Sequence, residues 1–507
     1  MTMKRKRTSI VCDVEKSNLN EELIQMSGST IFDLPDQIIV EIFFSLTTKS
    51  IVFCKSVCKK WRNLISEPQF AELHFAQAKP QFLFRTLDSI RISRTLYLVE
   101  PDDQDGPGFE SDLDLCMPSF EEYGCRYRRM KLNAKLKIPL RNAESVLKNQ
   151  DDPNTKKKKK KRCLNLKPKD HKFKIVNSCN GLLCLSEPLR NDPVALCNPV
   201  TGEFMNLPPG SCDDEDLTEV IDCGFGFSPK SNQYKVLRVF KRIYYVKRPE
   251  HHYDTSFNFT NTYAVVHTLG TDSWRSVDYA PQTKFKLGFP TYLDGALYGL
   301  YVDHGRPNYI ISFNFDDEKF EQLDVPPECE KTWITDITMG VLRGNLCVCD
   351  RSDLSVDIWT LQSFSTVRKA WSKLITVHCD WPYGLYQPIH GFNSGALLIF
   401  RNDTSELMYS NPDGFEPKCI HLCGLKTRYE TIVHIPSFMS LRDIVAGNSN
   451  VEILNVNTRC GSLKLPGETK DLILKGPVFE DALDSDSFEI EEDYWTNYWW
   501  KKKKVRN

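Results

Sequence analysis

The sequence lacks an excess of either charge, and it lacks any long apolar run. Its 507 residues carry 66 lysines and arginines against 67 aspartates and glutamates, a net charge of -1. A protein that neutralises nucleic-acid phosphates needs a basic excess, so we expect no nucleic-acid partner. No apolar run reaches the length of about 18 residues that a spanning helix requires, so we predict no membrane span.

Cysteine usage excludes a further class. The 18 cysteines are too few for a disulfide scaffold, in which more than about 8% of a short secreted chain is cysteine. The basic start, MTMKRKR, is followed by polar residues without the apolar segment of a secretory signal. We therefore expect reduced thiols and a protein of the cytoplasm, the nucleus or both.

Catalytic motifs are also missing. The sequence has no GxSxG elbow, no GxxxxGK[ST] phosphate loop and no HExxH pair. Gly224 and Gly226 lack the third glycine and the following helix of a dinucleotide site. With 67 acidic residues in the chain, carboxylate pairs occur throughout the sequence and do not indicate a catalytic site. We predict no catalytic residue and no cofactor.

The composition is that of a globular protein with several parts. Hydrophobic residues make up 41%, aromatic residues 11% and charged residues 26% of the chain. At about 100 to 200 residues per domain, the length predicts two or more units. Like charges gather in blocks that are typical of loops and tails. The acidic blocks are 100–114, 213–219 and 480–493, and the basic blocks are 4–7, 156–162 and 501–504.

Residues 32 to 75 predict three short helices after a polar, disordered stretch over residues 1 to 30. The first has an amphipathic stripe, with Pro35 in its first turn, Asp33 as its cap and Asp36 favouring the helix dipole. The second covers about residues 49 to 53. The third covers about 57 to 66 and ends at Glu67-Pro68. The stripe consists of Leu34, Ile38, Ile39, Ile42, Phe43 and Leu46.

So small a unit buries little apolar area and is marginally stable by itself. The stripe is either the core of a small helical bundle or a surface that docks on a partner. Docking is the favoured interpretation, because about 45 residues leave the stripe incompletely covered.

The residues LPDQIIVEIF (34–43), KSIV (49–52), VCKKWRNLIS (57–66) and PQF (68–70) closely resemble the plant F-box, with a domain over 31–76. The resemblance implies binding of a Skp-type adaptor, and through it a cullin. Thr47-Thr48 replaces a proline that many members have, which we expect to change the helix connection and not the docking face. The implied adaptor-binding residues are Leu34, Pro35, Ile38, Ile39, Ile42, Phe43, Val57, Cys58 and Trp61, of which Trp61 especially could instead be internal core.

Beyond residue 75 the pattern changes to short β-type runs separated by turn residues. A turn followed by an apolar strand recurs at Gly295, Gly344 and Gly395, at spacings of 49 and 51 residues. This is the period of a kelch-type propeller blade of roughly 50 residues. Four-stranded units of this kind hide their edges by closing into a ring, so the pattern predicts a β-propeller. The kelch double glycine is absent, which leaves the number of blades open.

The runs NSCNGLLCL (177–185), NPVTGEF (198–204), GFGFSP (224–229) and TIVHIPSFMSL (431–441) resemble the F-box-associated domain that follows the F-box in a large plant family. The resemblance implies a kelch-like β domain over 82–446, with charged insertions near 102–114 and 151–162. Residues 450–507 match nothing and predict a mostly disordered tail. The expected fold class is therefore α+β multidomain, a three-helix F-box followed by a mainly-β propeller.

One pattern resembles a metal site. Cys419, His421 and Cys423 lie on one face of a predicted strand, but a zinc site needs a fourth ligand and no CxxC pair supplies it. We predict no metal. The other closely spaced cysteines are interpreted as small buried hydrophobes. They are Cys54, Cys58, Cys179, Cys184, Cys347 and Cys349.

These observations favour a non-catalytic substrate receptor of an SCF-type (Skp, cullin, F-box) ubiquitin ligase. The F-box would bind the adaptor and the β domain an unknown target protein, so that proximity promotes ubiquitination of the target. Two alternatives are a propeller enzyme of the kelch-like oxidase kind and an F-box scaffold that acts outside any ligase. The basic run 156–162 is interpreted as a solvated insertion or a nuclear signal.

Overall fold

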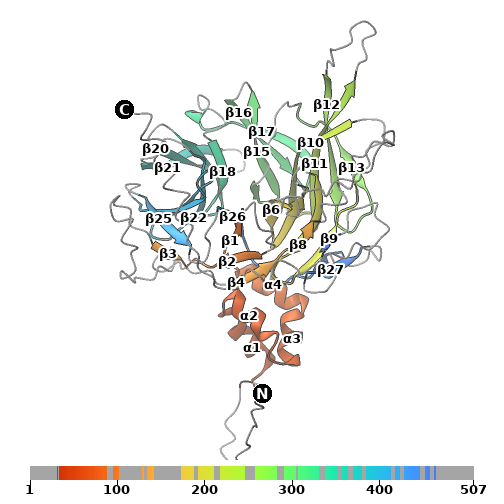
Figure 1. The fold of residues 1–507 in the computed structure, drawn as a ribbon, viewed down its shortest axis with the longest axis vertical. Coiled ribbons are helices and arrows are strands. Elements are labelled where there is room, and N and C mark those ends of the chain that lie inside the picture. Colours follow the sequence, from red (N-terminus) through yellow and green to blue (C-terminus); the bar gives the residue numbers. More distant parts are fainter. Residues whose placement is uncertain are drawn as a thin grey trace, which may run out of the picture. The chain divides into compact units, whose positions relative to one another are not determined.

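The computed structural model of the chain divides into two compact units, Met1–Ile65 and Ser66–Asn507 (Figure 1). Residues 1–30, the basic block 156–162, the terminal blocks 480–493 and 501–504, and residues 102–114 of the first acidic block lie outside the described residues. Residues 217–219 of the acidic block 213–219 belong to a strand and not to a loop. The described residues are 31, 34–87, 95–101, 128–130, 134–141, 173–187, 192–209, 217–245, 257–282, 291–303, 306–329, 337–351, 355–363, 369–378, 384–412, 417–422, 428–445, 451–456 and 462–463.

The helices of residues 32 to 75 number four, where the sequence predicted three. Pro68 ends one helix and begins the next, because proline cannot continue α3 but fits a first helical position, where its missing N–H needs no partner. The helices are α1 (Asp36–Phe44), α2 (Thr48–Cys54), α3 (Lys59–Ser66) and α4 (Pro68–Gln77). By its packing, α4 belongs to the larger unit.

Local capping explains where the first helices begin. Pro35 is the N-cap of α1 and not part of its first turn, and the predicted cap Asp33 lies outside the described residues. Thr47, at the position where related sequences were expected to have proline, caps α2 by accepting a hydrogen bond from the Ser50 N–H at 3.2 Å. Threonine thus replaces the fixed φ of proline with a side-chain cap.

The core of the smaller unit is formed by one side of each helix. Ile39 and Phe43 of α1, Ile51 of α2, and Trp61 and Ile65 of α3 are buried. The Phe43 and Trp61 rings meet edge to face, with centroids 5.3 Å apart, a geometry that aromatic pairs favour.

The larger unit is a six-bladed β-propeller (Figure 1). Each blade contains an antiparallel sheet of four strands. From the inner to the outer strand, the orders are β26-β1-β2-β4, β6-β7-β8-β9, β10-β11-β12-β13, β14-β15-β16-β17, β18-β19-β20-β21 and β22-β23-β24-β25. The first strand of each sheet faces the propeller axis, since these strands contact one another between blades, as β10 does with β6 and β18 with β22.

The strand bounds follow chain order. They are β1 (Gln81–Thr86), β2 (Thr95–Val99), β3 (Arg128–Met130), β4 (Ala134–Lys137), β5 (Leu140–Arg141), β6 (Lys174–Cys179), β7 (Leu182–Ser186), β8 (Pro193–Asn198), β9 (Glu203–Asn206), β10 (Leu217–Ser228), β11 (Gln233–Tyr245), β12 (Phe257–Thr268), β13 (Trp274–Val277), β14 (Thr291–Leu293), β15 (Ala296–Asp303), β16 (Arg306–Asn314), β17 (Lys319–Leu323), β18 (Ile337–Leu342), β19 (Asn345–Arg351), β20 (Ser355–Ser363), β21 (Lys369–His378), β22 (Tyr386–Gly391), β23 (Leu397–Arg401), β24 (Glu406–Ser410), β25 (Lys418–Leu422), β26 (Tyr429–His434), β27 (Ile453–Asn455) and β28 (Ser462–Leu463), with the short helix α6 at Leu441–Ile444.

The glycine period that predicted the propeller is confirmed. Gly295, Gly344 and Gly395 each lie in the connection between the first and second strands of their blades, and each has a positive φ. Asp294 and Arg343, which precede the first two glycines, also have positive φ. Two successive positive φ values are typical of the type I′ turn, whose twist matches a two-stranded hairpin.

The ring closes through strands from opposite ends of the chain. β26 pairs with β1 in antiparallel register, from Gln81 opposite His434 to Thr86 opposite Tyr429. The first blade therefore has an inner strand from the C-terminal part of the propeller and three outer strands from its N-terminal part. Arg85 of β1 supports this joint with an ion pair to Glu430, at 2.5 Å, and a hydrogen bond to the carbonyl of Phe173.

Two blades have an additional outer strand. β27 pairs with β9, and β3 pairs in parallel with β25. β27 lies past the predicted domain end at residue 446, in the segment assigned to a disordered tail. Its three residues take up the open edge of β9, which leaves fewer unpaired backbone groups. A separate parallel pair joins β28 and β5.

Gly224 and Gly226 have a packing role. A Cβ at Gly224 would overlap the side chain of Leu297, and one at Gly226 would overlap the Phe315 ring of the neighbouring blade. The motif GFGF therefore permits close approach of two blades, while Phe225 is fully buried in the core.

Replacing Gly181 should destabilise the propeller more than replacing Gly344. Both glycines have positive φ (81° and 75°), but a Cβ at Gly181 would overlap Ser437, and nothing lies within 4 Å of a Cβ at Gly344. Gly344→Ala should cost about 1 to 2 kcal/mol for its backbone conformation alone. Gly181→Ala adds the steric overlap, so its melting temperature should be the lower of the two. Equal melting temperatures would contradict this packing.

Candidate functional site

The predicted adaptor-binding residues divide into a buried and an accessible group. Ile39, Phe43 and Trp61 are buried in the core of the helical unit, so their side chains support the surface and are not available for direct contact. Leu34, Ile42 and Cys58 are half-buried, while Pro35, Ile38 and Val57 are exposed. The predicted set of adaptor-binding residues therefore mixed buried core residues of the helices with residues that are accessible on their surface.

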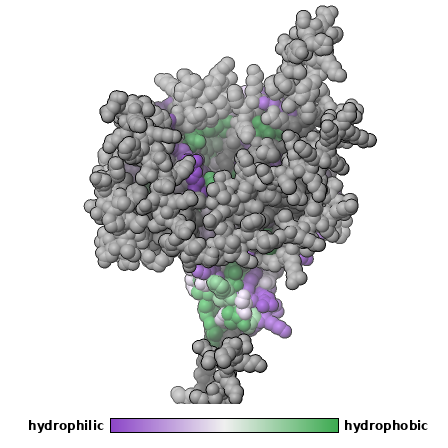
Figure 2. Space-filling model, in the orientation of Figure 1, coloured by the Kyte–Doolittle hydropathy of each residue, from purple (hydrophilic) through white to green (hydrophobic). Residues whose placement is uncertain are grey.

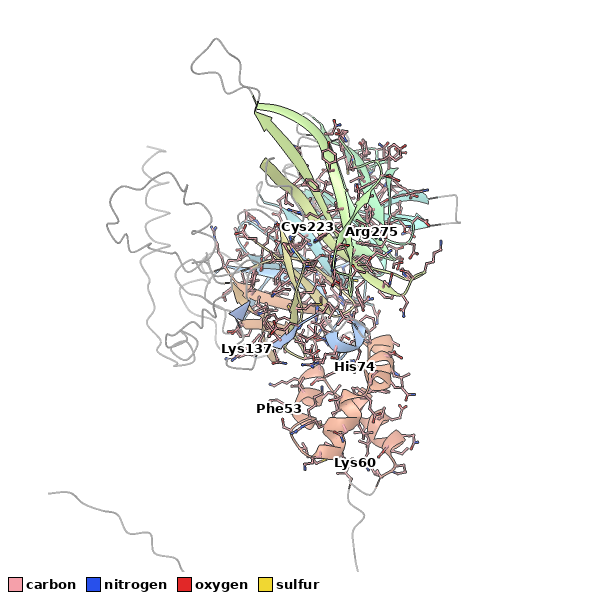
Figure 3. All side chains as sticks on the ribbon, turned by 90° about the vertical axis from the view of Figure 1, so that its right-hand side faces the viewer. Phe53, Lys60, His74, Lys137, Cys223 and Arg275 are labelled. Atoms are coloured by element: carbon pink, nitrogen blue, oxygen red, sulfur yellow. The ribbon has the colours of Figure 1, made fainter. Side chains whose placement is uncertain are left out.

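The predicted set missed Phe53, the most exposed large hydrophobic side chain among the described residues of the helical unit. Phe53 of α2 is 63% exposed, more than Val57 at 54% or Ile38 at 47%. We call these three residues the apolar patch. Figure 2 shows hydrophobic surface on the helical unit flanked by hydrophilic residues, and in Figure 3 Phe53 points away from the helices. The sequence contained a signal for this exposure, the apolar run Ile51-Val52-Phe53. Three consecutive residues of the seven-residue helix α2 cannot all lie on its buried side.

The turn between α2 and α3 holds its shape through local hydrogen bonds. The Arg62 Nε donates to the Lys55 carbonyl at 3.1 Å, and the backbone N–H of Val57 donates to the Cys54 carbonyl. The Trp61 N–H donates to the Cys58 sulfur at 3.4 Å, so Cys58 acts as a cap for α3 and not only as a small hydrophobe. These hydrogen bonds thus preorganise the turn that carries Val57 of the apolar patch.

The propeller has two different faces. Connections between the first and second strands of a blade, such as 293–296 and 342–345, are tight turns. α4 and β1 meet on this tight-turn face, where β26 ends. Connections from the last strand of one blade to the first strand of the next emerge on the opposite face and are longer, as in 277–291 and 323–337. We call the opposite face the long-connection face.

α4 packs on the tight-turn face through aromatic contacts. The Phe70 and His74 rings meet the ring of Phe438 at centroid distances of 5.8 and 4.9 Å. Burial lowers the pKa of His74 to about 4. The segment that carries Phe438 is fixed in turn by Asn198, whose side-chain amide donates to the carbonyls of Ser437 and Met439.

Burial also lowers the pKa of His434, to about 3, and its Nδ1 lies 2.9 Å from the Ser178 Oγ of the next blade. The sequence motif HIPSF therefore has a structural purpose, since its members join the closing strand to the second blade and to α4.

Charged residues connect neighbouring blades. Glu318, in the turn after β16, receives hydrogen bonds from Lys235 at 2.8 Å and, in bidentate form, from Arg275 of the preceding blade (labelled in Figure 3). Burial raises the pKa of Glu318, but these two cations outweigh it and lower the pKa below its usual value. The network is a structural ion cluster, because each member has a partner in the fold.

Within the described ranges, no three His, Cys, Asp or Glu side chains gather closely enough to hold a metal ion. Of the suspected trio, Cys419 is half-buried on β25, while Cys423 and the side chain of His421 lie outside what the structure describes. Cys179, Cys184, Cys347 and Cys349 are buried free thiols whose pKa values are raised by burial, as expected of small hydrophobes. The same interpretation is wrong for Cys54 and Cys58, which are only half-buried.

No helix among the described residues is both long enough and apolar enough to cross a membrane.

A small helical unit with an apolar patch, followed by a six-bladed propeller with a long-connection face, defines a substrate-recognition protein of the F-box and β-propeller class. The F-box domain model matches residues 31–73, and the F-box associated beta propeller domain model matches residues 125–437. The second match covers more than half of the chain, and the chain belongs to this family.

Curated relatives from Arabidopsis thaliana agree with this assignment. One F-box protein is 26% identical over 80% of this chain and 92% of its own length. An F-box/kelch-repeat protein is 24% identical over 68% of this chain and 79% of its own. The F-box protein CPR1 is 24% identical over 74% of this chain and 79% of its own. The sequence-based assignment to plant F-box proteins of this type is confirmed.

Truncation of Phe43 should lower the stability of the helical unit far more than truncation of Phe53. Phe43→Ala removes a buried ring and should destabilise the helical unit by about 3 to 5 kcal/mol, whereas Phe53→Ala should change its stability by about 0.5 kcal/mol or less. Hydrogen exchange of the amides in residues 36 to 66 of the full-length chain measures both effects. Fast exchange in Phe53→Ala, or full protection in Phe43→Ala, would show that the two rings have been placed wrongly.

Acid should weaken the propeller through its buried histidines. The pKa of His434 lies near 3 in the folded state against an ordinary 6.5, so the unfolded chain binds protons more readily below about pH 6.5. Stability is fully present above that pH and falls as the pH decreases towards 3, by about 2 kcal/mol per such histidine at pH 5. His434→Gln should make the melting temperature less sensitive to pH between 7 and 5 than it is in the wild type.

Proposed function

We propose that the protein is the substrate-recognition subunit of an SCF-type ubiquitin ligase, with no chemistry of its own. The F-box binds a Skp-type adaptor through the apolar patch, and the propeller binds a target protein. The observation that supports this most strongly is the apolar patch on a unit matched by the F-box domain model. Several large hydrophobic side chains exposed on one small unit are typical of a protein-binding surface.

The division of labour follows from the two units. A receptor that binds an adaptor at one unit and a target at the other raises the local concentration of target lysines at the ligase. This effect requires no reactive group in the receptor. It requires two surfaces that can be occupied at the same time.

We place target binding on the long-connection face of the propeller. Propeller loops vary in length without disturbing the blades that carry them, and binding residues are often found on such loops. The tight-turn face is occupied in part by α4 and the segment around Phe438. The long-connection face is therefore the better candidate for a target.

The rival function, a propeller oxidase, needs a group of metal ligands near the propeller axis. The residues that the structure describes offer no such group, so no specific observation favours this alternative. A metal assay on the purified chain remains its direct test.

Adaptor binding can be tested by changing the exposed members of the patch. Phe53→Asp and Val57→Asp, made separately, should reduce co-purification of a Skp-type adaptor by at least about tenfold, because each places a charge in an apolar interface. Both side chains are exposed, so the fold should be retained.

Leu73→Asp is the matched control. Leu73 is also a large hydrophobic residue and is 45% exposed, but it lies on α4 and is not a member of the apolar patch. It should leave adaptor binding unchanged. Wild-type protein that retains no adaptor, or patch variants that retain as much as the Leu73 variant, would refute the proposal.

A further inference from the structure

One residue on the long-connection face combines high exposure with an unfavourable backbone conformation. Tyr279 is 94% exposed, and its φ is +58°. For a bulky side chain a positive φ is uncommon and costs stability. An exposed ring with no described packing partner contributes no packing energy that would offset this cost. Among the described residues, the Tyr279 ring therefore has no packing role.

The short loop that carries Tyr279, residues 278–282, is rigidly attached to its surroundings. We call it the tyrosine loop. The Gln282 side-chain amide pairs with the backbone of Thr262, accepting from its N–H at 2.9 Å and donating to its carbonyl at 3.3 Å. The Tyr301 hydroxyl donates to the Gln282 carbonyl at 3.0 Å, and Ala280 packs on the core of the blades. The loop directly follows β13, at the end of that strand that lies on the long-connection face.

A rigid loop that holds an exposed tyrosine is what a binding hot spot needs. The aromatic ring offers a large contact area, and little conformational entropy is lost on binding because the backbone is already fixed. Asp278, the preceding residue, is exposed, and no ion pair is found for it among the described residues. An exposed aromatic ring and an exposed carboxylate on consecutive residues have the chemistry to bind a cation.

Among the described residues of the propeller, an aromatic ring and a carboxylate together bind a cation at three other places. Lys373 lies 4.9 Å from the Trp359 ring centroid and pairs with Asp357 and Glu328. In each case, one lysine or arginine side chain of the propeller contacts both an aromatic ring and a carboxylate.

The other two cations are arginines. Arg238 lies over the Phe240 ring and pairs with Asp192 at 2.8 Å, and Arg401 lies over the Tyr386 ring and pairs with Asp403 at 2.9 Å. At the tyrosine loop the acid and the ring are both exposed, and no described cation of the chain occupies them.

We infer that the tyrosine loop binds an arginine or lysine side chain of the target protein. The inference rests on the proposed function, since it names the chemistry by which the propeller would recognise its target. The target cation would lie over the Tyr279 ring, with Asp278 supplying the complementary charge. Stacked Tyr301 and Tyr309, with centroids 4.5 Å apart, lie in the neighbouring blade and support the loop through Tyr301.

A random linear peptide library, selected on the purified full-length chain, tests the chemistry of the ligand. Selected peptides should be enriched in arginine and lysine, and their binding should be measurable by fluorescence anisotropy. A library that yields no binder, or binders with no such enrichment, would overturn the inference. Binding that survives unchanged in Tyr279→Gly would do the same.

Tyr279→Gly separates recognition from structure. Glycine adopts a positive φ without strain, so the melting temperature should stay equal or rise, while peptide affinity falls by about tenfold or more. A structural role for the ring predicts a lower melting temperature instead. Tyr279→Phe should keep most of the affinity because it keeps the ring, and Tyr279→Leu should lose it.

Asp278→Asn should weaken peptide binding and make it less sensitive to salt. Leu374→Ala is the control, since Leu374 is an exposed hydrophobe on the outer strand β21. It should leave peptide binding unchanged. Adaptor co-purification should be unaffected in every tyrosine-loop variant, so failure of this inference is distinguishable from failure of adaptor binding.

Discussion

The pairing of β1 with β26 is the interaction on which the rest of the larger unit depends. Each blade has exposed edges of its own, and only ring closure places every blade between two neighbours. Closure is secured at several points by buried polar contacts. Arg85 pairs with Glu430, His434 contacts Ser178, and Asn198 binds the backbone around Ser437. Loss of this joint would free both ends of the ring together, because the strands that meet there are more than 300 residues apart in the sequence.

The closed ring gives the protein two faces with different constraints. On the tight-turn face, positive-φ glycines and the close approach of Gly181 to Ser437 leave little freedom to change the sequence. On the long-connection face, the blades impose few requirements on what joins them. The tyrosine loop shows the result, since its backbone strain at Tyr279 is compensated by hydrogen bonds through Gln282 and Tyr301. In the small helical unit, a similar division separates core residues such as Phe43 from surface residues such as Phe53.

Much of the fold was predictable because local patterns repeat. The spacing of Gly295, Gly344 and Gly395 followed from a glycine with positive φ in the turn between the first and second strands of successive blades. The number of blades was not predictable, because the closing blade combines strands from both ends and has no continuous repeat. The candidate site was predicted only in part. Ile38 and Val57 are accessible as expected, but Ile39 and Trp61 are buried, and Phe53 was missed. A stripe of apolar residues indicates that a helix has an apolar side, and does not indicate how far neighbouring helices cover it.

The sequence by itself determined the order of the parts, a helical F-box followed by a propeller of repeated strands, because helix periodicity and turn chemistry are local properties of the chain. Only the tertiary structure decided which residues of these parts are accessible. Pro68 begins a helix that packs on Phe438, and Tyr279 stands exposed on a fixed loop. Accessibility depends on contacts between elements, and in the propeller these join residues far apart in the sequence that meet only when the ring closes.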